Sequence, residues 1–295
     1  MNPREQGFLL LTSQLGDPDR KPLTVAQFRT LAQRVQGAEM LDQDRQLETS
    51  DLIKLGYGKQ MAEHIVCLLS HTQLLAYYEK KGQQHGCVPI TRVSNGYPVI
   101  LRQRLGLDSP GCFWAKGDTA ILDYPGISLV GSRELAEENR LFAGEVGRQA
   151  ARNGLTLISG NARGADRVAQ EACLEAGGRV VSIVADNLSE HTSRENVLYL
   201  SQDGYDDVFS AHRALSRNRS IHALGRMVFV AQATLGKGGT WDGTVRNLKQ
   251  GWSHVACFRD GSDASRELEQ MGAFLVDLAD LRDFDFIPPT EYTLI

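Results

Sequence analysis

Apolar residues recur at helical spacing through the first 85 residues of the chain. One run follows Thr24, with apolar side chains at Val25, Phe28, Leu31, Ala32 and Val35. Thr24 and Gln27 have the spacing of a capping box, in which both side chains satisfy free amides at a helix start. A second helical stretch runs from about residue 51 to 81 and is interrupted at Gly56-Tyr57-Gly58. The sequence therefore predicts an N-terminal helical domain over residues 1–85.

Residues 86–126 depart from this pattern. They contain several glycines, short strand-like pieces such as Val88-Pro89-Ile90, and the prolines Pro89, Pro98, Pro110 and Pro125. Proline lacks the backbone donor that helices and central strands need, so long regular elements are disfavoured here. We predict a linking segment that packs on the core of the next domain.

From Gly126 onward, short apolar runs alternate with glycine turns and helical patterns. Strands are predicted at residues 127–130, 155–158, 180–184, 227–231, 255–258 and 273–276. Nearly continuous apolar strands that alternate with helices are typical of a parallel sheet covered on both faces. The predicted fold class is α/β, with an extended Rossmann-like, mostly parallel sheet over residues 127–295.

Composition narrows the cellular setting. The chain has no run of about 20 apolar residues that could span a bilayer, and the short run Phe8-Leu9-Leu10-Leu11 lacks the flanks of a signal peptide. The five cysteines show no zinc spacing. We expect a cytoplasmic protein with reduced thiols and no membrane partner. A net charge of −4 argues against indiscriminate coating of nucleic acid but allows a local basic groove.

Three loops that follow predicted strands share one chemistry. They are Gly131-Ser132-Arg133, residues 159–166 with the sequence Ser-Gly-Asn-Ala-Arg-Gly-Ala-Asp, and Gly236-Lys237-Gly238-Gly239-Thr240. Glycine lets a backbone approach a ligand, arginine offers a planar fork to phosphate oxygens, and a helix N-terminus attracts anions. In a parallel sheet these loops meet at one edge, where ligands bind. The sequence therefore predicts that the three loops together form one anion-binding site at this edge.

A fourth basic element precedes the predicted strand at 227–231. Arg213, Arg217 and Arg219 fall within seven residues of an otherwise acidic chain, and on a helix Arg213 and Arg217 share a face. Several other sites are missing from the sequence. There is no G-x-G-x-x-G with its acidic partner, no P-loop, no nucleophile elbow and no histidine metal spacing. We expect no cofactor and no metal.

At these residues the chain resembles the DNA-processing protein family called DprA or Smf. The resemblance runs in order through Tyr97-Pro98 with Leu101, Pro110 with Lys116-Gly117-Asp118, Val130-Gly131-Ser132-Arg133, residues 158–166, Arg217-Asn218-Arg219-Ser220-Ile221 and Gly238-Gly239-Thr240. It covers about Tyr97 to Val276, well over half the chain.

The resemblance implies a non-enzymatic protein that binds single-stranded DNA, forms a homodimer and helps to load a RecA-type recombinase during DNA uptake and recombination. The arginine and lysine positions that match the family's basic pocket are Arg133, Arg163, Arg217, Arg219 and Lys237. With the loops above, the expected DNA- or phosphate-binding set is Gly131, Ser132, Arg133, Ser159, Gly160, Arg163, Gly164, Arg213, Arg217, Asn218, Arg219, Lys237, Gly238, Gly239 and Thr240.

The chain also departs from the family pattern. Gln170 stands near a position where the family often has histidine, and Ala214-Leu215-Ser216 replaces the usual Phe-Pro-x before the arginine motif. The second change bears on base stacking, for which Trp241 is the candidate. Residues 52–65 resemble a helix–hairpin–helix (SAM-like) module with Lys59 beside the hairpin, which would suit either a phosphate or a protein contact.

Two alternatives stay open. Gly238-Gly239-Thr240 is similar to the glycine-rich loop of Rossmann-like enzymes that cleave nucleoside monophosphates, and Asp242 is the nearby carboxylate. The other alternative is a SLOG-like sensor that binds a small nucleotide and signals to a partner protein.

Overall fold

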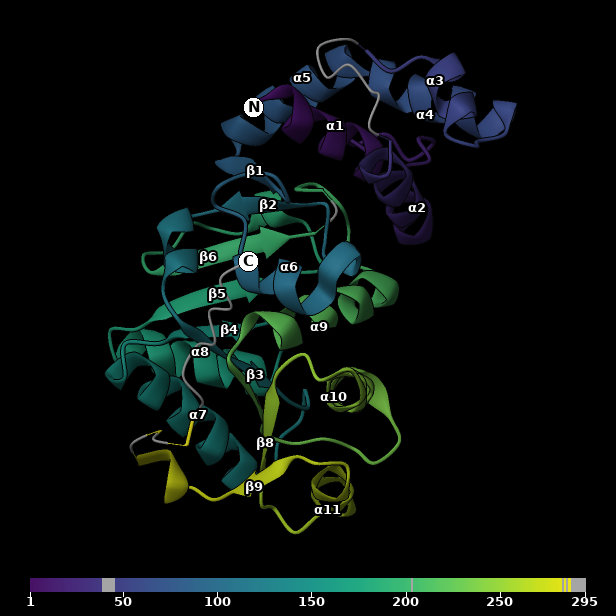
Figure 1. Ribbon diagram of the computed structural model, residues 1–295. Helices are drawn as coiled ribbons and strands as arrows, with labels where there is room; N and C mark the ends of the chain where they lie inside the picture. Colours follow the sequence, from purple (N-terminus) through teal and green to yellow (C-terminus); the bar gives the residue numbers. More distant parts are fainter. Residues whose placement is uncertain (39–45, 203, 283, 285, 288–295) are drawn as a thin grey trace.

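The computed structural model describes residues 1–38, 46–202, 204–282, 284 and 286–287. Within these residues the strands form one nine-stranded sheet in the order β1-β2-β6-β5-β4-β3-β7-β8-β9 (Figure 1). The strands are β1 Cys87–Thr91, β2 Cys112–Lys116, β3 Gly126–Val130, β4 Thr156–Ser159, β5 Arg179–Ile183, β6 Val197–Ser201, β7 Met227–Val230, β8 His254–Phe258 and β9 Phe274–Val276. β2 pairs antiparallel with β1 and β6, and the other neighbouring pairs are parallel.

Helices cover both faces of the sheet. α7 Glu137–Arg152 and α8 Ala165–Glu175 lie on one face. The other face carries α6 Val99–Leu105, α9 Ala211–Leu224, α10 Gly238–Gln250 and α11 Asp263–Gln270. The strands that run between these layers are buried almost throughout, which explains their continuous apolar sequences. The predicted α/β class with a mostly parallel sheet is confirmed.

The N-terminal helices form a separate layer beside β1 and β2 (Figure 1). They are α1 Pro3–Thr12, α2 Val25–Gln36, α3 Thr49–Lys54, α4 Lys59–Ser70 and α5 Thr72–Gln84. The capping box at the start of α2 is present, because the Thr24 hydroxyl accepts from the Gln27 amide at 3.3 Å and Gln27 Oε1 accepts from the Thr24 amide at 2.9 Å. α3 ends before the predicted glycine break and α4 begins just after it.

Two strands are absent from the predicted set. β2 lies inside residues 86–126, and with β1 it extends the sheet beyond β6, so this segment is part of the same sheet. β6 follows the short 3-10 helix η3 Leu188–Glu190. The other 3-10 helices are η1 Gly106–Asp108, η2 Thr119–Asp123 and η4 Asp280–Arg282.

Candidate functional site

A large hollow at the carboxyl edge of the parallel strands lies where the chain changes face. β3 and β7 are neighbours, but β3 leads into α7 on one face and β7 leads into α10 on the other. Such a switch point leaves a crevice between the two departing loops. A pocket of about 920 Å³ occupies it. The predicted site residues that line it are Gly131, Ser132, Arg133, Arg163, Arg217, Asn218, Lys237, Gly238, Gly239 and Thr240.

The first loop is held against the strand end of β7. The Ser132 amide and hydroxyl both donate to the Gln232 carbonyl, at 3.0 and 3.2 Å. Gln232 Oε1 in turn accepts from the Ala136 amide at 2.9 Å. The Ser132 hydroxyl is therefore engaged within the protein, and Arg133, which is exposed beside it, is the group of this loop that is open to a ligand.

Glycines of the first two loops serve the packing of one loop on the other. A Cβ at Gly131 would lie 2.5 Å from the Cβ of Ala165. Gly164 has a φ of +92°, and a Cβ there would overlap the backbone carbonyls of Ser132 and Arg133. The two loops touch at these positions, so neither glycine can be replaced by a residue with a larger side chain. These glycines thus allow one loop to pack on the other, whereas the sequence prediction was that they let the backbone approach a ligand.

The second loop is organised around a buried carboxylate. Asp166 is 7% exposed and accepts from the amides of Gly160 at 2.9 Å and Ala162 at 3.2 Å. Burial raises the pKa of Asp166, while the nearby Arg217 guanidinium and these amides act in the opposite direction. Because the protein's own carboxylate occupies these loop amides, they are not open to a ligand anion.

Arg217 lies beneath the pocket and is fixed in place. It is 8% exposed and donates to the Ile183 carbonyl at the end of β5. Its guanidinium rests where a Cβ at Gly160 would lie, so Gly160 makes room for it. Burial lowers the pKa of Arg217, and Asp166 and Asp186 oppose that shift. Arg217 contributes positive charge from below.

The third loop leaves the amides at the start of α10 open, although the Lys237 amide itself donates to the Thr234 carbonyl at 3.1 Å. α10 begins at Gly238, and Lys237 at its N-cap makes no side-chain capping bond. The first amides of a helix lack internal partners and carry a partial positive charge, so they suit an anion. Asn218 steadies the turn, because its Nδ2 donates to the Gly239 carbonyl at 3.2 Å.

The pocket carries unpaired positive charge around this helix start. In the described part of the chain, Arg133 and Lys237 take part in no salt bridge, and both are exposed. Arg163 pairs with Glu134 at 3.2 Å, but their side chains are 72% and 89% exposed, so water weakens this pair. Arg133 and Lys237 with the α10 amides therefore form the part of the site best suited to a phosphate.

Some predicted residues do not line this pocket. Ser159 is buried and bonded to Gln170, which also donates to Ser182 at 2.8 Å, so Gln170 ties β4 to β5. Gly160 and Gly164 lie within the loop packing already described. Arg213 points away and bonds the Val208 carbonyl at 2.6 Å and Asp207 at 3.4 Å. Arg219 lines a neighbouring hollow.

The aromatic residue predicted for base stacking is buried, and a different aromatic side chain is exposed in the pocket. Trp241 is 8% exposed and belongs to the core beneath α10, so its ring cannot receive a base. Phe209 lines the pocket and is 55% exposed. Its signal was the apolar pair Val208-Phe209 in a polar loop just before the arginine-rich helix.

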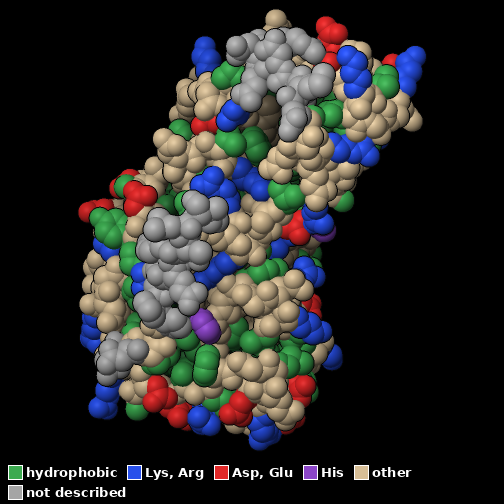
Figure 2. Space-filling model, in the orientation of Figure 1, with side chains coloured by type: hydrophobic (Ala, Val, Ile, Leu, Met, Phe, Trp, Pro, Cys, Tyr) green, Lys and Arg blue, Asp and Glu red, His purple; other side chains and the backbone are tan. Residues whose placement is uncertain are grey.

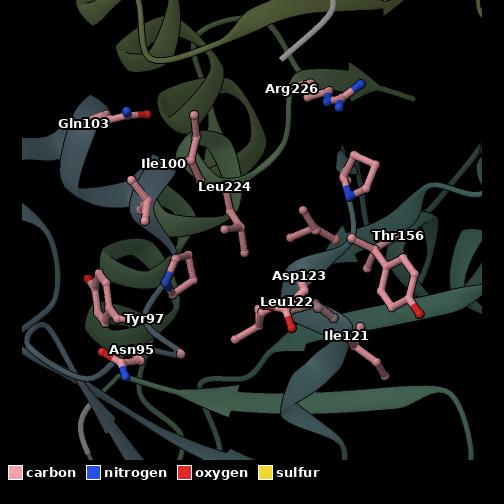
Figure 3. A pocket seen from close by; sticks show the side chains of 18 residues that line it. Asn95, Tyr97, Ile100, Gln103, Ile121, Leu122, Asp123, Thr156, Leu224 and Arg226 are labelled. Atoms are coloured by element: carbon pink, nitrogen blue, oxygen red, sulfur yellow. The ribbon is translucent and has the colours of Figure 1, made fainter. Parts of the chain in front are cut away.

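A second pocket, of about 250 Å³, lies at the opposite, amino-terminal edge of the sheet (Figure 3). Ile100, Leu122 and Leu224 line it together with Tyr97 and the guanidinium-bearing Arg226. This pocket is mainly apolar, whereas Arg133, Lys237 and the start of α10 lie at the carboxyl edge. Within the described residues no group of three or more His, Cys, Asp or Glu side chains is placed to hold a metal. In the same residues no helix has the length and apolar character needed to cross a bilayer.

The fold and the pocket define a Rossmann-like α/β protein with a crevice lined by basic side chains at the switch point of its sheet. The family described as DNA recombination-mediator protein A matches residues 89–280, and the chain belongs to this family.

Curated relatives share this assignment. The chain is 28% identical over 194 residues to the DNA processing protein DprA of Streptococcus pneumoniae, covering 61% of this chain and 68% of the relative. It is 27% identical over 218 residues to the DNA processing protein DprA of Bacillus subtilis, covering 70% of each.

Solved structures show the same fold. The X-ray structure of DprA from Streptococcus pneumoniae superposes with a TM-score of 0.72 at 23% identity, covering 95% of this chain and 97% of that one. DprA from Helicobacter pylori, whose structure concerns its single-stranded DNA binding mode, gives a TM-score of 0.56 at 24% identity and covers 67% and 93%.

Proposed function

We propose that this chain binds single-stranded DNA in the pocket at the carboxyl edge of the sheet and protects the strand during DNA uptake or recombination. The observation that carries the proposal is the placement of Arg133 and Lys237, both without a salt bridge in the described residues, over the uncapped start of α10. Phosphates neutralised by such side chains release counterions, which supplies sequence-independent affinity. The family's description as a recombination mediator supports the same reading.

The pocket suits a single strand better than a duplex. Only an unpaired strand can place a base face on an aromatic ring, and Phe209 offers such a face at the pocket wall. The α10 amides and the cations would hold the backbone without reading the sequence. Binding should therefore depend strongly on salt and weakly on base identity.

The test is binding of fluorescent oligo-dT at two salt concentrations, with duplex and mononucleotide competitors. Arg133→Ala and Lys237→Ala should each weaken binding and reduce the salt slope by about 0.7 per lost phosphate contact. Arg152→Ala is the control, because Arg152 is exposed at the far end of α7. Unchanged affinity and slope in both site variants would remove the pocket from the proposal.

We propose two further partners, a RecA-type recombinase and a second copy of the chain. We also propose that the protein binds both in the cytoplasm. The support for the first is the family's role as a recombination mediator. The support for a homodimer is the apolar edge at β9, where Phe274 is 56% exposed beside Met271 and Leu278. Phe274→Glu should shift the sedimentation coefficient toward the monomer, and a RecA nucleation assay on coated strands tests loading.

A small nucleotide, sensed or cleaved, is the second candidate ligand. Asp242 favours it, because this exposed carboxylate lines the same pocket as Thr240. A thermal shift with mononucleotides but none with oligonucleotides would favour a sensor. Release of free base from a nucleotide panel, lost in Asp242→Asn, would favour an enzyme.

A further inference from the structure

A second basic hollow continues from the proposed DNA pocket along the groove between α9 and α10. It measures about 450 Å³ and shares Leu215, Asn218, Gly239 and Asp242 with the first pocket. Both helices start at the carboxyl edge of the sheet and run toward its amino edge. The two hollows therefore form one continuous path from the sheet edge onto the outer face.

Three cations line this hollow, and one carboxylate accompanies them. Arg219 comes from α9, and Arg246 and Lys249 come from α10, where they lie three residues apart on one face. In the described part of the chain none of the three forms a salt bridge. Asp242 is the accompanying carboxylate, so the hollow has excess positive charge. Figure 2 shows Lys and Arg side chains along this side of the molecule, from the N-terminal helices down past α9 and α10.

Arg219 shows that the charges are close enough to repel. Its Nε is buried without a hydrogen-bond partner. Burial lowers the pKa of Arg219, and the neighbouring Arg246 and Arg29 lower it further. Gathering like charges around a half-buried guanidinium costs free energy, and an anion placed among them would recover it.

The floor of the hollow indicates what part of a strand it would contact. Trp241 and Trp252 line it but are only 8% and 9% exposed, so neither presents a free ring face for stacking. The groups that reach into the hollow are cationic ends. The site would therefore hold phosphates and leave bases unread.

We propose that Arg219, Arg246 and Lys249 form a second phosphate subsite, and that a bound single strand leaves the pocket along the α9–α10 groove toward the amino edge of the sheet. This inference rests on the proposed function. The inference adds to the proposed function a direction for the bound strand. It also adds a minimum strand length, because only a strand long enough to pass Asn218 and Gly239 would reach the three cations.

The experiment measures affinity for an oligo-dT ladder of about 4 to 16 nucleotides, which spans common single-strand site sizes. The variant R246A/K249A changes two exposed side chains and is compared with R148A/R152A on the opposite face of the sheet. The shortest binding strands should bind R246A/K249A as they bind the unchanged protein. Longer strands should bind it at least tenfold more weakly, with the salt slope reduced by about 1.4.

Equal affinity of the variant and the unchanged protein for the longest strand would overturn the second subsite. A uniform loss at every length would also overturn it, because the cations would then act on the first pocket. If no strand of any length binds the unchanged protein, the proposed function itself fails. The oligo-dT ladder distinguishes this outcome from the two outcomes that overturn only the second subsite. If R246A/K249A loses binding to an acidic protein partner but binds DNA of every length normally, the groove is a protein-binding site and not a DNA subsite.

Discussion

At the scale of single residues, Phe209 gives the most direct test of base stacking. Stacking of a base on an aromatic ring contributes about 1–3 kcal/mol by alanine substitution. Phe209→Ala should therefore weaken oligo-dT binding by about 5- to 150-fold, measured by fluorescence anisotropy, and leave the salt slope unchanged because no charge is lost. Tyr77→Ala is the control, since Tyr77 is 66% exposed on α5. Equal affinities of the two variants would exclude Phe209 from the contact.

His222 is a second residue with a measurable consequence. Its ring is fully buried, and neither ring nitrogen has a hydrogen-bond partner. Burial lowers the pKa of His222 to about 4, below its ordinary value of 6.5. Because the folded state resists protonation, stability is full above pH 6.5 and is lost as pH falls toward 4, by up to about 1.4 kcal/mol per pH unit.

His222→Leu should remove this part of the pH dependence while keeping an apolar side chain of similar size under Gly243. Urea unfolding between pH 7 and pH 4.5 measures it. The free energy of unfolding of the variant should fall less steeply than that of the unchanged protein. Parallel curves would show that His222 already titrates in the folded state.

The residue scale also shows what the sequence could and could not reveal about the site. Arg133, Lys237 and the glycine turn before α10 were found because each follows a strand in a parallel pattern. Arg213 looked equivalent to Arg217 on the same helix face. Only the fold shows that Asp207 and the Val208 carbonyl draw it away from the pocket. Such contacts depend on loop geometry that periodicity does not encode.

At the scale of elements, the contact between α7 and α8 depends on one glycine. A Cβ at Gly147 would overlap the backbone carbonyl of Ala169, so the two helix backbones pack closely there. Gly147→Ala should lower the free energy of unfolding by about 1–3 kcal/mol, because backbone has to move. Gly144→Ala, one turn earlier, meets only ordinary contacts at 3.5 Å or more. It should gain up to about 1 kcal/mol from helix propensity.

Urea titrations of the two variants give the comparison. The same substitution in the same helix should move the midpoint in opposite directions. Equal shifts would mean that α7 adjusts its position freely and that the close approach is not a constraint.

The elements also explain which strands were predictable. β3, β4 and β7 are apolar runs bounded by glycine turns, so their pattern was clear. β2 and β6 were absent from the prediction although they are equally buried. β2 sits among prolines and belongs to no strand–turn–helix unit, whereas β6 leads into α9 but follows a long polar stretch without a glycine turn. β2 takes its place in the sheet by antiparallel pairing with the distant β6, while β6 pairs parallel with β5 on its other side.

At the scale of the whole molecule, the N-terminal helices and the sheet share a buried aromatic junction. Tyr78 of α5 stacks on Tyr205 at 4.3 Å between ring centroids and meets the edge of Trp114 of β2 at 5.2 Å. Its hydroxyl donates to Asp206, and Tyr205 donates to the Tyr78 carbonyl at 3.1 Å. One apolar cluster thus contains residues of α1, α5, β1 and β2.

Because this junction is continuous, the N-terminal helices and the sheet should unfold together. Tyr78 is only 3% exposed, so Tyr78→Ala leaves a buried cavity and should lower the free energy of unfolding by about 3–5 kcal/mol. Far-UV circular dichroism and tryptophan fluorescence should still report one coincident transition, at lower urea. The exposed neighbour variant Tyr77→Ala should leave the midpoint almost unchanged. Two separated transitions in Tyr78→Ala, with only the first shifted, would show that the N-terminal helices fold as an independent unit and that the junction serves only to dock them.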